Sequence, residues 1–432
     1  MINWFKSEVS INVTKTRLTF YTENYLVGGA ERYLIELMNR LDSEQYDLRL
    51  LCNENPVFQS FVRNNLHVPV AVYPIPIRCL AASAANAAAR ALSRSSEREH
   101  SLLSKLGAYP LGVIRYIDFA MNYARLARTF RSDPFDILYV NNGGYPGGHS
   151  CLAAILAAAN AGIPVRLMAV HNIASNYKTP IFAVIERWID RCIGRHAQQV
   201  ITQSEAARAS LIRRRGFLPE KIRTIYFGVD VESQSISDVV SAKKREIGVP
   251  RNVPVVGMIA LFLQHKGYQV LLQAAPQILN SFPQTKFVLV GDGPFYESIR
   301  AQTDASGLGQ HILFTGYRTD FLEILTTFDI IVLPSLEFES VPYVILDAMA
   351  LGKPAIGSSI GGIPEAISDG ETGLLVPPGD SDALARAVSA ILADANLARR
   401  YGEAAVERVR RVFNMNVLMA ETEKLFQTFL RI

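Results

Sequence analysis

The sequence predicts an α/β protein with two doubly wound, Rossmann-like domains, and three observations indicate this fold class. Short runs rich in β-branched residues alternate with helical patterns, which implies crossover units and parallel sheets. These runs are almost wholly apolar, as expected for strands that helices cover on both faces. The alternation stops once and then restarts, and the 432 residues suffice for two or three domains of roughly 100–200 residues each.

The first domain is predicted to span residues 1–230, with helices such as 30–41 and 181–195 between its strands. The expected strands are 18–21, 47–52, 137–140, 165–171, 200–203 and 222–226. Residues 79–133 break the alternation and are rich in alanine and arginine. We expect them to form helices inserted in this domain.

The second domain is predicted to span residues 253–412, after a polar linker at 231–252 that contains one short helix. Its expected strands are 253–260, 286–291, 312–316, 330–334, 355–358 and 374–377. Ligands of such sheets bind at the carboxyl ends of the strands. A central cleft between two facing domains is therefore the expected site.

Composition argues against several classes of function. A net charge of +4 is too small to indicate a nucleic-acid partner, and no nucleic-acid-binding signature is present. The four cysteines form no C-x-x-C pair, which argues against a disulfide framework or a zinc site and fits a reducing compartment. The N-terminus does not resemble a signal peptide, and polar residues interrupt the most apolar stretch, 151–170. We therefore expect a soluble, cytoplasmic protein.

Two basic segments leave two interpretations open. Arg90, Arg94 and Arg98 are four residues apart and share a helix face. A second basic run covers residues 213–223. Each segment is either a solvated face or a surface that attracts anionic lipid head groups. The second interpretation would place the protein at the inner face of a membrane, as a peripheral protein.

Glycine-rich turns follow several predicted strands. Gly28 and Gly29 open the first helix, and a Gly-Gly-Ile-Pro-Glu segment at 361–365 opens a later one. Either turn could bring backbone N–H groups close to an anion at a helix N-terminus. Either could equally be a tight turn without a ligand. The Gly-Asp-Gly-Pro segment at 291–294 is expected to form a turn.

Three further polar residues raise a choice between a functional and a structural role. His171 ends a predicted strand, where it could bind a ligand or serve the structure alone. Asp380 and Asp382 resemble an acid-x-acid metal motif, but they directly precede a helical pattern. We expect them to cap that helix rather than to bind a metal.

Two acids stand inside an otherwise apolar run, ESVPYVILDAMALGKP, at residues 339–354. Pro342 suits the first position of a helix that ends before Gly352. Glu339 then lies in the preceding loop. Asp347 lies about 8–9 Å further along the helix axis, at roughly 1.5 Å per residue.

An elongated ligand could contact both of these carboxylates. The N–H groups near Ser340, Val341 and Tyr343 lie between the two acids and could hold an anion. Two hydroxyl-rich ends joined by phosphates describe a nucleotide sugar. Carboxylates accept strong hydrogen bonds from sugar hydroxyls because the acceptor is charged.

With these motifs, the chain resembles the family 4 glycosyltransferases, which have the GT-B fold. The resemblance rests on the acid-x7-acid pattern of Glu339 and Asp347 and on the Ala-Met-Ala-Leu-Gly-Lys-Pro segment that follows it. Further matching motifs fall in the family's order at 28–31, 171, 204–205, 227–230, 265–267, 291–294, 361–365 and 369–373. The resemblance covers nearly the whole chain and is strongest from residue 253 to residue 385.

This resemblance implies an enzyme, a metal-independent hexosyltransferase that retains the anomeric configuration. The donor would be a nucleotide sugar, such as a UDP- or GDP-sugar, and no other cofactor is expected. The acceptor would be a glycan or a lipid-linked molecule, used in the assembly of a cell-surface polysaccharide or glycolipid. A C-terminal helix at 413–432 would cross back to the first domain.

The resemblance also implies roles for the matching residues. Glu339 would bind the donor sugar, Lys266 would neutralise the leaving diphosphate, and His171 would lie close to the donor sugar. These three would be the catalytic residues. The residues that bind the donor would be Gly28, Gly29, Lys266, Tyr317, Arg318, Ser340, Val341, Tyr343 and Asp347, of which Asp347 would hold the ribose and Tyr317 and Arg318 would lie near the base.

Two positions depart from the family pattern. Asp347 stands where the family usually has the longer glutamate, and Leu261 stands where it usually has an arginine that contacts the diphosphate. Loss of one such stabilising group costs on the order of 10²–10³ in rate. The alternative function is therefore a non-catalytic relative that binds a nucleotide sugar or a partner enzyme. A nucleotide-sugar epimerase of the same fold is a third interpretation.

Overall fold

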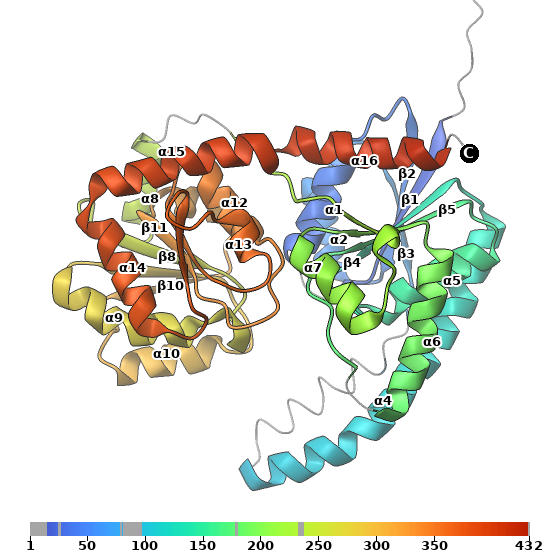
Figure 1. Ribbon diagram of the computed structural model, residues 1–432, viewed down its shortest axis with the longest axis horizontal. Coiled ribbons are helices and arrows are strands. Elements are labelled where there is room, and N and C mark those ends of the chain that lie inside the picture. The colour runs from blue at the N-terminus through green and yellow to red at the C-terminus, as the bar shows by residue number, and fades with distance from the viewer. Residues whose placement is uncertain are drawn as a thin grey trace, which may run out of the picture. The chain divides into compact units, whose positions relative to one another are not determined.

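The computed structural model describes residues 15–24, 27–77, 80, 97–177, 180–231 and 237–430. These residues form two sheets flanked by helices (Figure 1). By internal contacts the chain divides into two units. One contains 1–142, 147–168 and 195–198, and the other contains 143–146, 169–194 and 199–432.

The first sheet has seven strands in the order β3-β2-β1-β4-β5-β6-β7. The strands are β1 (Thr16–Thr22), β2 (Tyr46–Asn53), β3 (Ala71–Ile75), β4 (Ile137–Asn142), β5 (Val165–Val170), β6 (Gln199–Thr202) and β7 (Ile222–Thr224). The helices in this half are α1 (Gly29–Arg40), α2 (Pro56–Asn65), α4 (Glu97–Ser132), α5 (His149–Asn160), α6 (Pro180–His196), α7 (Glu205–Ser210), the π-helix η1 (Leu211–Arg215) and the 3-10 turn η2 (Pro219–Lys221).

The second sheet has six parallel strands in the order β10-β9-β8-β11-β12-β13. Its strands are β8 (Val255–Ile259), β9 (Lys286–Val290), β10 (Ile312–Gly316), β11 (Ile330–Leu333), β12 (Ala355–Ser358) and β13 (Gly373–Val376). The helices are α8 (Ser237–Glu246), the 3-10 turn η3 (Gln264–Lys266), α9 (Tyr268–Ser281), α10 (Tyr296–Ala305), α11 (Phe321–Thr326), α12 (Tyr343–Ala350), α13 (Ile363–Ala366), α14 (Ser381–Ala393), α15 (Ala395–Val412) and α16 (Met415–Leu430). All twelve predicted strands are present.

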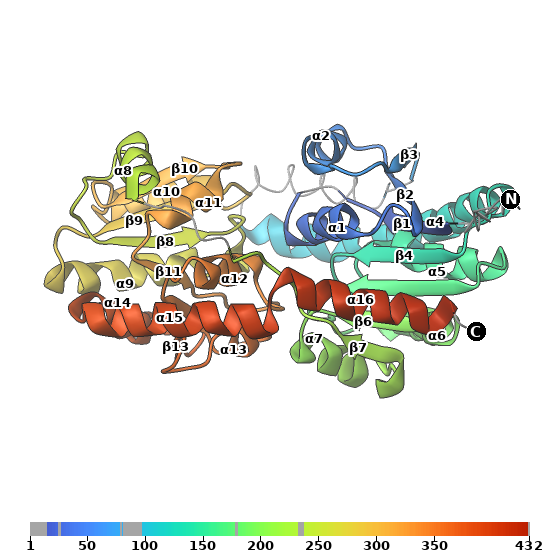
Figure 2. The ribbon, with the colours of Figure 1, turned by 90° about the horizontal axis from the view of Figure 1, so that it is seen from above.

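Helices cover both faces of the second sheet, which explains why its strands are apolar throughout. Helices α9, α10 and α14 pack together on one face, and α8, α11, α12 and α15 lie on the other (Figures 1 and 2). All four residues of β11 are buried. The strand order reverses direction at β8 and β11, and loops at such a point commonly bind ligands.

Strand β3 was not predicted. Four of its five residues are exposed, and it contains Pro74, which cannot donate a ladder hydrogen bond. Such a sequence is compatible only with the edge of a sheet, where β3 lies. Its exposure removes the apolar pattern by which the other strands were recognised.

The segment predicted to be a linker contains α8, in agreement with the expected short helix. Lys243 of α8 lies 2.6 Å from an oxygen of Asp320, which precedes α11. In the unit that contains residues 199–432, Arg223 of β7 also forms an ion pair with Glu421 of α16. The predicted domain boundaries themselves stay predictions.

The predicted insertion at 79–133 contains α4, a helix of 36 residues. Arg90 and Arg94 lie outside the described residues, and so does the side chain of Arg98. In the part of the chain that the structure describes, no helix combines the length and apolarity needed to span a bilayer.

Candidate active site

Two of the predicted catalytic residues meet at the carboxyl edge of the second sheet. Lys266 ends the turn that follows β8, and Glu339 lies in the loop that follows β11, the neighbouring strand. The Nζ atom of Lys266 lies 2.5 Å from Oε1 of Glu339. The Ser335 hydroxyl donates to the same oxygen at 2.7 Å. Glu339 is buried, so this cation is its charge partner in a site with little water.

Glycines hold the loop of Glu339 from both sides. Gly361 has φ +54°, and a Cβ there would lie 1.9 Å from the carbonyl oxygen of Glu339. The N–H of Gly362 donates to the same carbonyl at 3.0 Å. Gly267 has φ +81°, and its Cβ would lie 1.9 Å from the carbonyl oxygen of Pro334. Only glycine tolerates these approaches, so the glycines fix where Glu339 lies.

Helix α12 begins directly after this loop. Its first residue is Tyr343, and Pro342 is the N-cap rather than the first helical residue, one position later than predicted. Within the residues that the structure describes, the N–H groups of Ser340 and Val341 donate to no protein acceptor. Free N–H groups at the start of a helix favour an anion. The predicted anion-binding segment therefore lies next to the Lys266–Glu339 pair.

Asp347 is buried in the middle of α12. Tyr317 and Arg318 follow β10, at a different part of the sheet edge. Tyr317 is 58% exposed. Arg318 donates to Asp320 at 2.7 and 2.6 Å and also pairs with Glu246. Arg318 thus belongs to a surface ion cluster, and none of its ion pairs is with Lys266 or Glu339.

His171 directly follows β5 and lies in an aromatic stack. Its ring centroid is 5.6 Å from that of Phe227, and Phe227 is 4.3 Å from Tyr343. Burial lowers the pKa of His171 to about 3, although a hydrogen bond with Gln203 acts in the opposite direction. The imidazole is therefore neutral near pH 7 and can donate or accept a hydrogen bond, but it supplies no positive charge.

The glycine turn at Gly28 and Gly29 lies in the other unit. Gly28 precedes α1, and its N–H donates to the Glu31 carboxylate at 2.7 Å. Burial raises the pKa of Glu31 to about 7. The turn thus has an acidic side chain of its own at the start of the helix.

Leu261 follows β8 and is half-buried. Its carbonyl accepts a hydrogen bond from the N–H of Leu263 at 2.8 Å, within a turn that leads to Lys266. Among the described residues, the ion-pair partner of Glu339 is Lys266, and no arginine pairs with Glu339. Leu261 itself supplies no cation at the position where the family usually has an arginine.

The contacts of Glu365 have no signal in the sequence. Its carboxylate accepts hydrogen bonds from the N–H groups of Glu205 and Ala206 at 2.7 and 2.8 Å, and from the Tyr226 hydroxyl at 2.9 Å. Ser204, the N-cap of α7, lies 2.9 Å from the hydroxyl of Ser340. These partners are more than 130 residues apart in the chain, so no local pattern indicates them.

Two smaller predictions are confirmed for Asp380 and Asp292, whereas Asp382 lies in the first turn of α14 and is not its cap. Asp380 is the N-cap of α14 and accepts from the N–H of Ala383 at 2.8 Å. Asp292 accepts from the N–H of Gly293 at 2.7 Å, as expected for a turn. Glycines at 291 and 293 have φ values of +138° and +156°.

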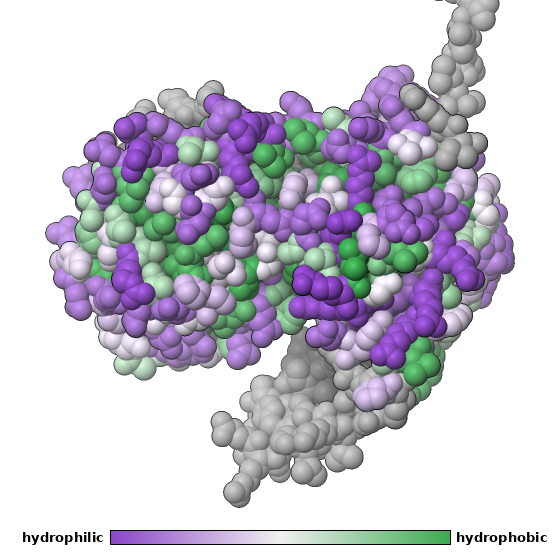
Figure 3. All heavy atoms as spheres, in the orientation of Figure 1, coloured by the Kyte–Doolittle hydropathy of each residue, from purple (hydrophilic) through white to green (hydrophobic). Residues whose placement is uncertain are grey.

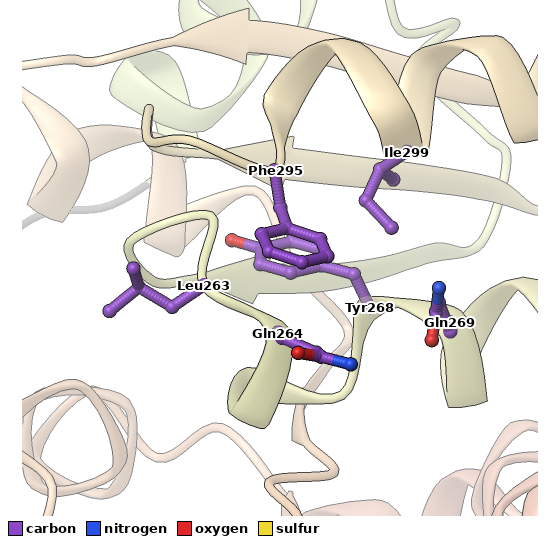
Figure 4. A pocket seen from close by; sticks show the side chains of 6 residues that line it. All are labelled: Leu263, Gln264, Tyr268, Gln269, Phe295 and Ile299. Atoms are coloured by element: carbon purple, nitrogen blue, oxygen red, sulfur yellow. The ribbon is translucent and has the colours of Figure 1, made fainter. Parts of the chain in front are cut away.

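A shallow surface depression, with no room for a water molecule, lies beside η3 and α9 (Figure 4). It is lined by Leu263, Gln264, Tyr268, Gln269, Phe295 and Ile299. The Tyr268 hydroxyl donates to the carbonyl of Ala260 at 2.7 Å. The depression has no charged lining residue, and the Lys266–Glu339 pair is not part of it. It is therefore a packing feature and not the candidate site.

Two Rossmann-like sheets, with a buried carboxylate–lysine pair and free N–H groups at the edge of the second, define a glycosyltransferase of the GT-B fold. The family model described as Glycosyltransferase Family 4 matches residues 27–233, and the one described as Glycosyl transferases group 1 matches residues 240–408. The chain is 30% identical over 314 residues to the phosphatidyl-myo-inositol mannosyltransferase of Mycobacterium leprae, a match that covers 71% of this chain and 77% of that protein. The chain belongs to this family of glycosyltransferases.

Further relatives agree with this assignment. The N-acetyl-alpha-D-glucosaminyl L-malate synthase of Bacillus anthracis is 33% identical over 210 residues. That match covers 49% of this chain and spans about half the length of the relative, 54%. Alr3699/HepE of Anabaena, solved in complex with UDP, superposes with a TM-score of 0.74 at 21% identity over 96% of this chain and 100% of that one. The predicted GT-B fold is confirmed.

Proposed function

We propose that this glycosyltransferase moves a hexose from a nucleotide-diphosphate sugar to a lipid-linked or glycan acceptor. Transfer would retain the anomeric configuration and need no divalent metal, in the assembly of a cell-surface polysaccharide or glycolipid. A lipid-linked acceptor is suggested by the relative that mannosylates phosphatidyl-myo-inositol. A uridine nucleotide donor is suggested by the structural neighbour that binds UDP.

The observation that supports the proposal most strongly is the Lys266–Glu339 pair beside free backbone N–H groups. The leaving diphosphate carries negative charge that must be stabilised as the glycosidic bond breaks. Lys266 supplies a cation, and the N–H groups of Ser340 and Val341 supply donors at the start of α12. Together they can do the electrostatic work that other transferases assign to a metal ion.

Each remaining residue has a role that its surroundings allow. The carboxylate of Glu339 would accept hydrogen bonds from the donor sugar, and that of Asp347 from the ribose. His171 is neutral and would hydrogen-bond to the donor sugar rather than act as a cation. No residue of this set is an evident nucleophile, so we favour attack by the acceptor from the side of the leaving group.

The other members of the predicted donor site enter the proposal through the resemblance, and among them only Tyr343 has a contact that links it to His171, through Phe227. Gly28 and Gly29 would line the diphosphate, and Tyr343 would line the sugar beside His171. Tyr317 and Arg318 would lie near the base. Arg318 is the weakest member of this set because three acidic contacts already occupy its guanidinium.

Turnover of a panel of UDP- and GDP-sugars in the presence of EDTA tests the proposal. Wild type should hydrolyse or transfer one donor, and Glu339→Ala should lose at least about 10²-fold of that rate, as expected for removal of a group that stabilises the transition state. Glu337→Ala is the matched control because Glu337 is an exposed acid two residues away. Its rate should equal that of wild type.

Leu261→Arg belongs in the same assay. If the missing arginine limits the rate, Leu261→Arg should be faster than wild type by about 10–100-fold, and Leu263→Arg, two residues away, should not. Activity that depends on added Mg²⁺ or Mn²⁺ would contradict metal independence. Activity in Leu261→Arg but none in wild type would instead identify a nucleotide-sugar-binding protein that has lost catalysis.

A further inference from the structure

Helix α6 carries an exposed apolar stripe. Val184, Ile185 and Trp188 are 68%, 40% and 59% exposed. The spacing of three and four residues places them on one face of the helix. Figure 3 shows apolar residues next to strongly hydrophilic ones over the lower part of this helix. A partly apolar helix face with a tryptophan on it indicates a surface that is covered when the protein works.

Every exposed charge on the same face is positive. Arg187 and Arg191 are exposed and continue the stripe at the helical spacing. The two acids of α6, Glu186 and Asp190, are buried. The stripe therefore presents arginines with no acid of this helix beside them to neutralise them. Arg187 also lies over the Tyr177 ring, 5.2 Å from its centroid.

The buried face of α6 is held firmly, which keeps the stripe outward. Arg215, whose side chain is 1% exposed, lies 2.8 Å from Glu186 and 3.6 Å from Asp190. Asp190 also accepts hydrogen bonds from the hydroxyls of Tyr145 and Tyr177 at 2.7 and 2.8 Å. Because this buried network fixes the rotation of the helix, Trp188 cannot turn inward.

Arg215 fits neither of the two interpretations offered for the basic run at 213–223, which stay open for the exposed Arg213 and Arg214. The Arg215 side chain is buried and paired, so it is neither a solvated residue nor a lipid contact. Its guanidinium donates to the Ser175 carbonyl at 2.8 Å. Ser175 lies in the segment between His171 and α6. The stripe therefore lies on the first helix after His171, a predicted catalytic residue.

We infer that the face of α6 formed by Val184, Ile185, Arg187, Trp188 and Arg191 binds the surface of an anionic lipid bilayer. The inference rests on the proposed function, because a lipid-linked acceptor would be presented at such a surface. Tryptophan favours the boundary between head groups and acyl chains, where its ring is apolar and its N–H stays hydrated. Arginines beside it are attracted to anionic head groups while their stems cover apolar surface.

The chain offers an intrinsic probe for this contact. It contains two tryptophans, Trp4 and Trp188, so Trp4→Phe leaves Trp188 as the sole emitter. Its fluorescence is recorded with vesicles of phosphatidylcholine alone and with vesicles that also contain phosphatidylglycerol. The expected result is a blue shift with the anionic vesicles only, reversed by high salt, together with quenching by brominated acyl chains.

A matched pair of variants separates this face from general attraction to the net charge. R187E/R191E should weaken partitioning by at least about 30-fold, from roughly 1 kcal/mol for each arginine near an anionic surface. R410E/R411E changes the charge by the same amount at two exposed arginines of α15 and should leave partitioning unchanged. Thermal unfolding of all variants verifies that the fold is intact.

Three results would overturn the inference. The first is an emission of Trp188 that anionic vesicles do not change. The second is partitioning that R187E/R191E and R410E/R411E weaken equally. The third is emission that depends on protein concentration without lipid, which would identify a second copy of the chain as the occupant. Partitioning needs no donor, so it can fail while soluble donor hydrolysis persists, and hydrolysis can fail while partitioning persists.

Discussion

His171 shows how burial decides the chemistry of a single residue in this protein. The imidazole lies beside Phe227 and has little water around it, so its protonated form is unfavourable. A neutral histidine can hydrogen-bond to a sugar hydroxyl without repelling Lys266. The same burial has a consequence for stability, because the unfolded chain exposes this histidine to water.

The free energy of unfolding should therefore fall below pH 6.5. The folded-state pKa of His171 is lowered from 6.5 to about 3, so between these values the unfolded chain binds a proton that the folded chain does not. Stability is complete above pH 6.5 and is lost progressively as the pH falls toward 3. At pH 5 the loss is about 2 kcal/mol relative to pH 7.5.

Urea unfolding of wild type and His171→Gln at both pH values measures this loss. Glutamine has no charge to gain, so the variant should lack about 2 kcal/mol of the pH dependence even if its stability at pH 7.5 is lower. If the free energy of unfolding changes equally in both proteins between pH 7.5 and pH 5, burial does not lower the pKa of His171.

The position of Glu339 depends on close backbone contacts between its own loop, the turn before α13 and the turn η3. The turn before α13 touches the Glu339 backbone through Gly361, and the turn η3 touches Pro334 through Gly267. Neither contact leaves room for a Cβ atom. Backbone packing at the edge of the second sheet therefore fixes the position of Glu339. Small changes in this packing should alter the catalytic rate.

Gly361→Ala tests this packing against a matched control, Gly370→Ala. Both positions have positive φ, +54° and +73°, so each alanine should cost about 1–2 kcal/mol in backbone strain. Only Gly361 has a close neighbour, the Glu339 carbonyl oxygen at 1.9 Å from the added Cβ, whereas Gly370 has open space. We expect Gly361→Ala to lose at least about tenfold in kcat and Gly370→Ala to keep its kcat.

Urea unfolding and kcat, measured on the same preparations, distinguish these effects. Both variants should lose the stability that backbone strain costs, Gly361→Ala should lose more because its Cβ meets the Glu339 carbonyl oxygen, and only Gly361→Ala should lose kcat. Equal kcat values in the two variants would show that the Gly361 contact does not position Glu339.

The elements that could be predicted from sequence are those with a local signal. Apolar runs between turns predict buried strands such as β8 and β11, and Asp380 indicates the start of a helix. Strand β3 has no such signal because it is an exposed edge strand. In the site, Glu339 and Lys266 were found through their motifs, and the structure brings them together.

Contacts between distant segments could not be predicted in the same way. The hydrogen bonds of Glu365 to α7 and the burial of Arg215 depend on which loops meet in three dimensions. Arg215 stands in a run of basic residues whose pattern indicates exposure. Only its neighbours in the fold, Glu186 and Asp190, explain why it is inside.

In both sheets the spatial order of the strands reverses beside the first strand, β1 in one sheet and β8 in the other, as in Rossmann-type folds. The loops that carry the predicted site residues follow the carboxyl ends of strands, where ligands of such sheets bind. A hydrogen bond also joins two residues that are far apart in the sequence. The N–H of Val229 donates to the carbonyl of Phe413, which precedes α16, at 2.8 Å. The chain thus combines a family fold with a departure, Leu261, that makes its catalytic rate a question for experiment.

The proposed mechanism is tested by the anomeric configuration of the product that wild type forms in EDTA, followed by proton NMR from the first minutes of reaction. A retaining, metal-independent transferase gives a new glycosidic signal with the same configuration as the donor sugar, formed without any divalent cation. A product of inverted configuration, or a reaction that begins only when Mg²⁺ or Mn²⁺ is added, would contradict a retaining, metal-independent transfer at Glu339 and Lys266.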